Sequence, residues 1–249
     1  MVQIIHDHVK FQIDEIQVED FQEQIIKSKF VKPFDLSKAP LLRVGIIKSE
    51  RRECVLIIDM HHIIGDGTTF SIIEDEIKRF YFGEELQPLK LHYRDYSEYQ
   101  NSDQQKRKID KQKDYWLKKL SGPLPILKLP FDSIHKLNQD NSGARVCFPL
   151  SEEETEIINS IIKDIGITPY LAFLFIYILL LSKLSGQEDI IVGTPITERK
   201  NPDLERIAGM FINMLPLRNF PEQNLFIKDY LLKLKRSTIE CFENQDFQF

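Results

Sequence analysis

The stretch Met60-His61-His62-Ile63-Ile64-Gly65-Asp66-Gly67 is the most informative part of this sequence. It begins at the end of an apolar, β-branched run over residues 54–60, which predicts a strand. A segment with helical spacing follows directly after it. The stretch therefore lies at a strand-to-helix junction, where rigid elements hold functional side chains and a loop exposes them.

The two histidines leave three interpretations open. A neutral imidazole can accept a proton near neutral pH, because its ordinary pKa is about 6.5. Neighbouring residues in extended backbone point in opposite directions, so we expect one of His61 and His62 to face a substrate and the other to face inward. Gly65 and Gly67 would allow unusual backbone angles or the close approach of a ligand. The stretch is then a simple turn with Asp66 capping the next helix, a metal site, or a site of acid–base catalysis in which Asp66 organises the loop.

The residue spacing gives a metal site little support. Neither an HExxH pattern nor a third nearby histidine accompanies the pair, and Cys54, Cys147 and Cys241 lie far apart without a CxxC motif. We therefore expect no bound metal. We expect each cysteine to be a small buried apolar residue in a reduced, cytoplasmic protein.

Alternating and helical spacings predict both strands and helices, so the fold class is α/β or α+β. Strands are predicted over residues 9–13, 40–48, 54–60, 144–150, 189–193 and 212–217. Helical spacing at Val18, Phe21, Ile25 and Ile26 predicts a first helix. A second helix is capped by Thr68 and ended by Gly83, and a third covers residues 95–120. Further helices follow a capping box at 151–154 and cover residues 168–185 and 226–242. The proline- and glycine-containing residues 121–142 predict a linker between two lobes, 1–120 and 143–249.

The composition is that of a soluble globular chain. Its 249 residues include 33 Lys+Arg and 38 Asp+Glu, with a formal charge of −5, 42 % apolar residues and 29 % charged residues. These values exclude a disordered chain and give no support for nucleic-acid binding. Residues 165–182 carry no charge, but Thr168-Pro169 marks a helix start within them. A buried core helix therefore explains this run better than a membrane span, and we expect neither a membrane nor a nucleic acid as partner.

Residues 60–67 match the HHxxxDG motif of the condensation domains of nonribosomal peptide synthetases. Chloramphenicol acetyltransferase and other acyltransferases share this motif and a two-lobed fold. Further segments resemble that family in the same order along the chain: residues 32–43, 93–99, 115–117, 186–195, 203–218 and 244–247. The resemblance covers essentially the whole chain.

The resemblance implies a reaction in which an acceptor amine attacks a donor thioester and an amide forms. Both substrates would arrive on the 4′-phosphopantetheine arms of peptidyl carrier proteins, with adenylation domains as neighbours and no cofactor bound directly by the chain. By position, His62 would be the catalytic or substrate-positioning histidine, and His61 would be buried and supporting. Gly67 would bring its backbone N–H near the reacting centre. Asp66 would be structural through an ion pair, with Arg199 as the candidate partner.

Some residues depart from the family pattern. Gly65 stands where serine is frequent, which we expect to be a mild change. Thr197 and Glu198 replace small residues before Arg199, so a carboxylate lies beside that arginine and could divert its pairing. Asn244 replaces a histidine. The family's first two motifs and the continuation of its last motif do not occur here, so we expect a two-lobed chloramphenicol acetyltransferase-like fold that is incomplete at both ends.

Two other functions remain open beside a condensation domain. An epimerisation-type domain of the same superfamily also retains HHxxxDG. A non-catalytic remnant would share the fold and bind carrier proteins without turnover.

Overall fold

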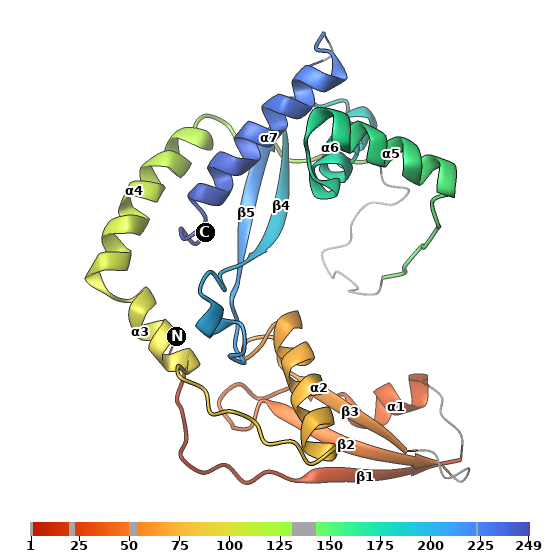
Figure 1. The fold of residues 1–249 in the computed structure, drawn as a ribbon, viewed down its shortest axis with the longest axis vertical. Coiled ribbons are helices and arrows are strands. Elements are labelled where there is room, and N and C mark those ends of the chain that lie inside the picture. Colours follow the sequence, from red (N-terminus) through yellow and green to blue (C-terminus); the bar gives the residue numbers. More distant parts are fainter. Residues whose placement is uncertain (1, 20–22, 50–53, 131–142, 223) are drawn as a thin grey trace. The chain divides into compact units, whose positions relative to one another are not determined.

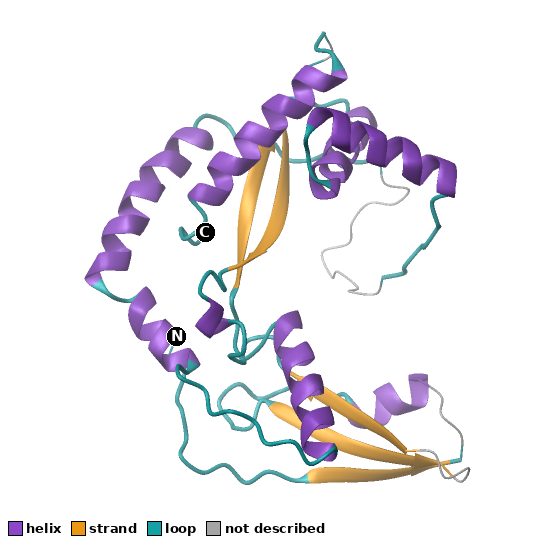
Figure 2. Ribbon diagram, viewed as in Figure 1, coloured by secondary structure: helices purple, strands orange, loops and turns teal. Residues whose placement is uncertain are grey.

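The computed structural model describes residues 2–19, 23–49, 54–130, 143–222 and 224–249. The chain divides into two compact units, each of which is described by itself. The first unit contains residues 1–99 and 199–212, and the second contains residues 100–198 and 213–249. Figure 1 labels the elements along the chain, and Figure 2 shows the mixture of helices and strands that defines an α+β fold.

A three-stranded sheet forms the base of the first unit. Its strands are β1 (Ile13–Val18), β2 (Leu42–Ser49) and β3 (Cys54–Met60). β2 lies in the centre, parallel to β1 and antiparallel to β3. Because β1 and β2 are parallel, a crossover must join them, and α1 (Glu23–Phe30) lies within it. The antiparallel pair Leu42–Met60 fixes the end of β3, from which the histidine loop leaves the sheet.

Two further helices belong to the first unit. α2 (Gly67–Tyr81) follows the histidine loop, and Gly83, with φ of 77°, follows its C-cap. α3 (Tyr93–Gln100) begins after His92, whose backbone N–H donates to the Asp95 carboxylate at 2.7 Å. All residues of α3 except Gln100 fall within the first unit.

The second unit packs helices around a two-stranded sheet. Its elements are α4 (Asp103–Lys119), α5 (Glu152–Ile165), α6 (Pro169–Ser185), β4 (Ile190–Thr197), β5 (Ile212–Asn219) and α7 (Ile227–Glu243), except that Ile212 itself is counted with the first unit. The predicted capping box is present, because Ser151 and Glu154 exchange side-chain and backbone hydrogen bonds. Thr168 and Gly186 begin and end α6 as predicted.

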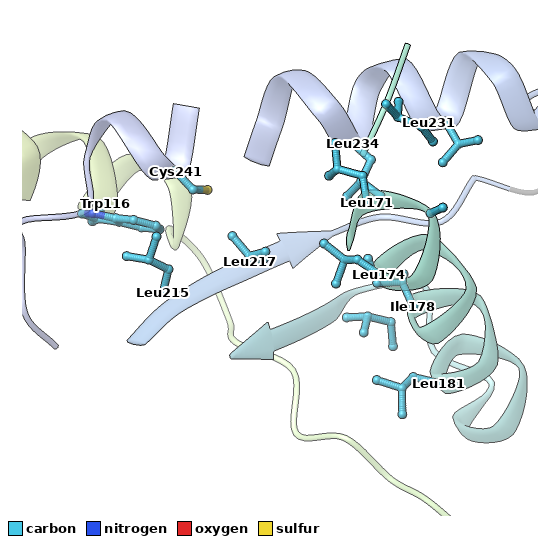
Figure 3. Packing of buried hydrophobic residues seen from close by; sticks show 13 residues of the cluster. Trp116, Leu171, Leu174, Ile178, Leu181, Leu215, Leu217, Leu231, Leu234 and Cys241 are labelled. Atoms are coloured by element: carbon cyan, nitrogen blue, oxygen red, sulfur yellow. The ribbon is translucent and has the colours of Figure 1, made fainter. Parts of the chain in front are cut away.

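The core of the second unit is an apolar cluster centred on β5. Figure 3 shows side chains from α4, α6 and α7 gathered around Leu215 and Leu217 of β5. Trp116 and Ile178 are 1 % and 0 % exposed, so they contribute large areas of apolar surface to the cluster. The prediction of a buried helix at 168–185 holds for one face only, since Tyr177 and Leu180 of α6 are about half exposed.

No single helix of the described chain is long and apolar enough to cross a membrane. α5 and α6 reach that length and apolar content only when they are taken together, and the chain bends by 106° at the break between them.

Several sequence-based boundaries are wrong, for two physical reasons. The helix predicted over 95–120 is broken, because Ser102 caps a new helix at the Gln105 backbone N–H. Residues 144–150 form no strand, since none of the described strands pairs with them, and an unpaired strand leaves its backbone groups unsatisfied. The N-terminal strand likewise begins at Ile13 rather than at residue 9, where pairing with β2 begins.

Smaller predictions also fail or lie outside the described residues. Val18 ends β1 and belongs to no helix. Cys54 and Cys147 are exposed, and only Cys241 is buried. Phe21, the connection at 50–53 and most of the predicted linker, residues 131–142, lie outside the described residues.

The compact units differ from the lobes expected from the sequence. α4 belongs to the second unit, because Trp116 is buried in that unit's core. Residues 199–212 belong to the first unit although they follow β4 in the chain. The division into lobes at 121–142 stays a prediction.

The C-terminal segment is fastened to one face of α4. The Trp116 indole N–H donates to the Asn244 carbonyl at 2.8 Å. The Gln112 amide donates to Asp246 Oδ2 at 2.7 Å and accepts from the backbone N–H groups of Asp246 and Phe247 at 2.9 and 3.0 Å. Lys108 adds an ion pair to Asp246 at 2.8 Å. The segment at 244–247, which resembles a family motif, therefore has a structural role in this unit.

The buried amide of Gln112 yields a stability prediction. Gln112→Ala should lower the free energy of unfolding by about 1–3 kcal/mol, because the buried Asp246 N–H and the partly buried Phe247 N–H lose their acceptor. Gln104→Ala, on the exposed face of the same helix, is the matched control and should change stability little. Urea denaturation measures both, and equal effects of the two changes would contradict the anchoring role.

Candidate functional site

The histidine loop joins the end of β3 to the start of α2 in the first unit. The His61 backbone N–H donates to the Leu41 carbonyl at 3.0 Å, and the Ile64 N–H donates to the His61 carbonyl at 3.1 Å. The first bond continues the sheet pairing by one residue, and the second closes a tight turn. The loop is therefore held at the sheet end by its backbone.

The side chain of His62 is exposed and anchored at one nitrogen. Its Nδ1 lies 2.8 Å from the Gly65 carbonyl oxygen. A carbonyl can only accept, so the hydrogen bond assigns the proton of the neutral ring to Nδ1. Nε2 then carries a lone pair and can accept a proton or a hydrogen bond. This arrangement supplies a fixed ring with an acceptor nitrogen.

His61 has the opposite tautomer. Its Nδ1 accepts from the Ile63 backbone N–H at 3.1 Å, so the proton of the neutral ring is on Nε2. Its ring meets the edge of Phe34 at a centroid separation of 6.0 Å. His61 was expected to be buried, but it is only partly buried in the structure.

Asp66 is buried at the N-terminus of α2, with 2 % of its surface exposed. It is the N-cap residue, and its Oδ1 accepts from the Thr69 backbone N–H and from Thr69 Oγ1, both at 2.9 Å. Thr69 returns the contact by accepting from the Asp66 N–H at 3.2 Å, which completes a capping box. The helix is thus capped by Asp66 and not by Thr68, because the extended backbone of Asp66 places its carboxylate over the first turn.

Arg199 lies against the same carboxylate. Its Nη2 is 2.9 Å from Asp66 Oδ1 and 3.1 Å from Oδ2, and its side chain is 4 % exposed. Nη1 donates to the carbonyls of Leu204 and Ile207 at 3.0 and 2.7 Å, which turns the chain around the guanidinium. The neighbouring Glu198 is buried in the second unit and accepts from Gln100 Nε2 at 3.1 Å.

The pKa of Asp66 lies below its ordinary value. Burial on its own raises the pKa of this carboxyl, but hydrogen bonds from the Thr69 backbone, Arg199, the Thr69 hydroxyl and the Phe211 backbone N–H outweigh it. Asp66 is therefore a buried carboxylate that stays ionised. Its role in the loop is electrostatic and structural, since its lone pairs are occupied by the protein itself.

Gly65 and Gly67 have different surroundings. A Cβ at Gly65 would lie 2.6 Å from Met60 Cε and 2.9 Å from Thr69 Cγ2. A serine here would have to displace these atoms, so glycine at this position is coupled to the packing of Met60. A Cβ at Gly67 would meet no atom within 4 Å, so this exposed residue leaves open space beside the first turn of α2.

The segment before β2 is clasped by Arg43. Its Nη1 and Nη2 donate to the carbonyls of Lys32 and Pro33 at 2.6 and 2.9 Å, and its Cζ lies 3.7 Å from the centre of the Phe34 ring. Asp59 of β3 pairs with the same guanidinium at 2.7 Å. Arg43 thereby holds Phe34 next to His61, a role that sequence reasoning missed.

Other contributors were also missed by sequence reasoning. The Thr69 hydroxyl and the Phe211 backbone N–H complete the shell of Asp66, and Phe211 N lies 3.2 Å from Oδ2. The capping pattern at Asp66 could have revealed Thr69. No local signal marks Phe211, because its contact joins distant parts of the chain. Among the described residues, no group of three His, Cys, Asp or Glu side chains could hold a metal ion.

Comparison with known proteins decides the family. The sequence model described as Condensation domain matches residues 1–249. This chain belongs to that family. Bacitracin synthase 3 of Bacillus licheniformis is 41 % identical to it over 248 residues, which are 100 % of this chain and 4 % of the synthase. Surfactin synthase subunit 1 of Bacillus subtilis is 37 % identical over 246 residues, 99 % of this chain and 7 % of that subunit.

Solved structures show the same fold. The condensation domain of the Monacolin K polyketide synthase has a TM-score of 0.79 at 22 % identity, covering 96 % of this condensation-domain chain and 56 % of the other. A four-domain nonribosomal peptide synthetase has a TM-score of 0.84 at 21 % identity, covering 98 % of this chain and 19 % of the synthetase. The chain therefore spans only a small part of the curated synthetases it matches and just over half of the solved condensation domain.

The buried ion pair predicts a large loss of stability when it is broken. Asp66→Ala should cost about 3–5 kcal/mol, because Arg199 would remain buried without its carboxylate. Glu76→Ala is the matched control, since Glu76 and Arg206 form a partly exposed pair at 3.7 Å, worth about 0–1 kcal/mol. Chemical denaturation compares the two changes. An unaltered unfolding midpoint for the Asp66 variant would contradict the structural role.

The lowered pKa of Asp66 predicts how this stability depends on pH. The folded-state pKa lies below the ordinary value of 3.8, so the stabilisation is complete above that value and is lost as pH falls through the folded pKa. The difference in unfolding free energy between the natural chain and Asp66→Asn should be constant near neutral pH and shrink below about pH 4. A difference that does not vary with pH would show that the carboxyl is not ionised in the fold.

Proposed function

We propose that this chain takes part in amide-bond formation within a nonribosomal peptide synthetase. Its relatives bacitracin synthase 3 and tyrocidine synthase 3, the latter 38 % identical over 248 residues, support this assignment. By analogy with such synthetases, the donor would be an acyl or peptidyl thioester and the acceptor an aminoacyl thioester. Peptidyl carrier proteins would present both on 4′-phosphopantetheine arms, with adenylation domains as neighbours.

The state of His62 is the observation that carries the proposal. Its ring is exposed, and the Gly65 carbonyl fixes the proton on Nδ1, so Nε2 is an acceptor. An attacking amine loses a proton as the C–N bond forms, and an acceptor nitrogen beside it can bind that N–H or remove the proton. A protonated ring could in turn donate to the oxygen of the tetrahedral intermediate.

The bond changes in this reaction are simple. The acceptor nitrogen attacks the thioester carbonyl carbon, the C–N bond forms, and the C–S bond breaks. The proton lost by nitrogen passes to His62 Nε2 and finally to the departing thiolate. Where the amine is already neutral, His62 would mainly hold it in place, since little deprotonation is then needed before attack.

The remaining predicted residues would support this histidine. Asp66 and Arg199 would fix the end of the loop, because their ion pair joins the N-cap of α2 to the segment that carries the arginine. His61 would hold the start of the loop against Phe34. Gly67 would leave room for the substrate, since no atom lies within 4 Å of the position its Cβ would take.

The proposal is tested by supplying the chain with a donor and an acceptor on carrier proteins and measuring dipeptide by mass spectrometry. His62→Ala should reduce product formation about 10²–10⁴-fold, the usual contribution of a positioned acid–base group. His92→Ala, at another exposed histidine of the same unit, is the control and should retain activity. Full activity of His62→Ala would overturn the assignment.

The same assay separates the two other functions. Exchange of the donor α-proton without amide formation would indicate an epimerisation-type domain. Carrier binding without any product would indicate a non-catalytic remnant.

A further inference from the structure

Residues 199–212 follow β4 in the chain but belong to the first unit, and we call them the return segment. Arg199 is the first residue of this segment. Both ends of this segment contact the first turn of α2 and its N-cap. Arg199 pairs with Asp66, and the Gly209 backbone N–H donates to Thr69 Oγ1 at 3.1 Å. The Gly209 carbonyl lies 3.3 Å from Arg199 Nη2, so the end of the segment folds back onto its beginning. Whatever holds Gly209 therefore also helps to hold Arg199.

Tyr93, the first residue of α3, lies directly against that end. A Cβ at Gly209 would be 2.1 Å from Tyr93 Cδ2 and 2.6 Å from Cε2, so only a glycine fits beneath the ring. The Tyr93 hydroxyl donates to the Met210 carbonyl at 2.8 Å. The ring also meets Phe211 edge-on at a centroid separation of 5.2 Å. One side chain thus contacts three consecutive residues of the return segment.

Phe211 carries this contact on to the ion pair. Its side chain is 1 % exposed, and the Arg199 guanidinium lies over its ring at 3.9 Å. Its backbone N–H donates to Asp66 Oδ2 at 3.2 Å. Tyr96, one turn further along α3, also packs against the Phe211 ring, at a centroid separation of 4.6 Å. Phe211 therefore lies among two tyrosines, the arginine and the carboxylate.

We infer that Tyr93 is a positioning residue that clamps Gly209, Met210 and Phe211 and so holds Arg199 against Asp66. The start of α3, where Tyr93 lies, is held by a hydrogen bond from the His92 backbone N–H to the Asp95 carboxylate. The link from this clamp to the histidine loop rests on the proposed function, whereas the clamp itself does not.

A double-mutant cycle tests the clamp in the full chain. Gly209→Ala should destabilise the natural chain strongly, because the added methyl overlaps the Tyr93 ring. In a Tyr93→Ala background the same change should cost much less, since the ring is gone. Tyr99→Ala, at an exposed tyrosine of the same helix, is the control and should leave the cost of Gly209→Ala unchanged. Additive effects of Tyr93→Ala and Gly209→Ala would overturn the packing argument.

A second readout separates positioning from general stability. The pKa of the Asp66 carboxyl, followed by ¹³C NMR, should rise in Tyr93→Ala towards its ordinary value, because the guanidinium is less firmly held. Tyr93→Phe keeps the ring and loses only the bond to Met210, so it should fold and show a smaller rise. A lower melting temperature with an unchanged pKa of Asp66 would show that Tyr93 only stabilises α3 and would overturn the inference. Neither measurement depends on amide formation. A failure of the proposed function can therefore be told apart from a failure of the inference about Tyr93.

Discussion

The carboxylate of Asp66 is a charge placed inside the protein, and the surrounding structure is arranged to satisfy it. An ionised group with 2 % of its surface exposed loses nearly all its hydration, which is costly unless donors replace the water. Here the donors are the Thr69 backbone and hydroxyl, the Phe211 backbone and the Arg199 guanidinium. One of these residues, Thr69, is near Asp66 in sequence, and the other two come from the second half of the chain. The charge therefore requires the chain to return to the first unit.

This requirement also shapes the histidine loop. Backbone pairing with β2 fixes its beginning, and the N-cap at Asp66 fixes its end. Between these points the His62 ring is oriented by one hydrogen bond to the Gly65 carbonyl, which leaves its second nitrogen as an acceptor. The ring needs no carboxylate partner to select this tautomer. Asp66 consequently acts on the loop through the backbone and not through direct contact with an imidazole.

The second unit depends on different forces. Apolar side chains of α4, α6 and α7 pack on β5, and buried area supplies the main stabilisation. Polar contacts add to this packing, because Gln112 and Trp116 hydrogen-bond to the backbone of residues 244–247. The segment at 244–247, which resembles a family motif, is joined to α4 by these hydrogen bonds. Buried amide groups suit this task, because they donate and accept at once.

The sequence by itself determined the local elements and the family. Hydrophobic spacing located β2, β3, α6 and α7, the capping box at Ser151 located the start of α5, and the motif around His62 indicated the condensation-domain family. Hydrophobic spacing gave the wrong element where a strand needs a neighbouring strand to pair with. Residues 144–150 alternate like a strand but pair with none of the described strands. Spacing also failed at Ser102, where a local cap interrupts a continuous helical pattern. Resemblance suggested Arg199 as a partner for Asp66, but only the tertiary structure placed Tyr93, Gly209 and Phe211 around that pair, because packing between residues more than a hundred positions apart leaves no periodic trace in a single sequence.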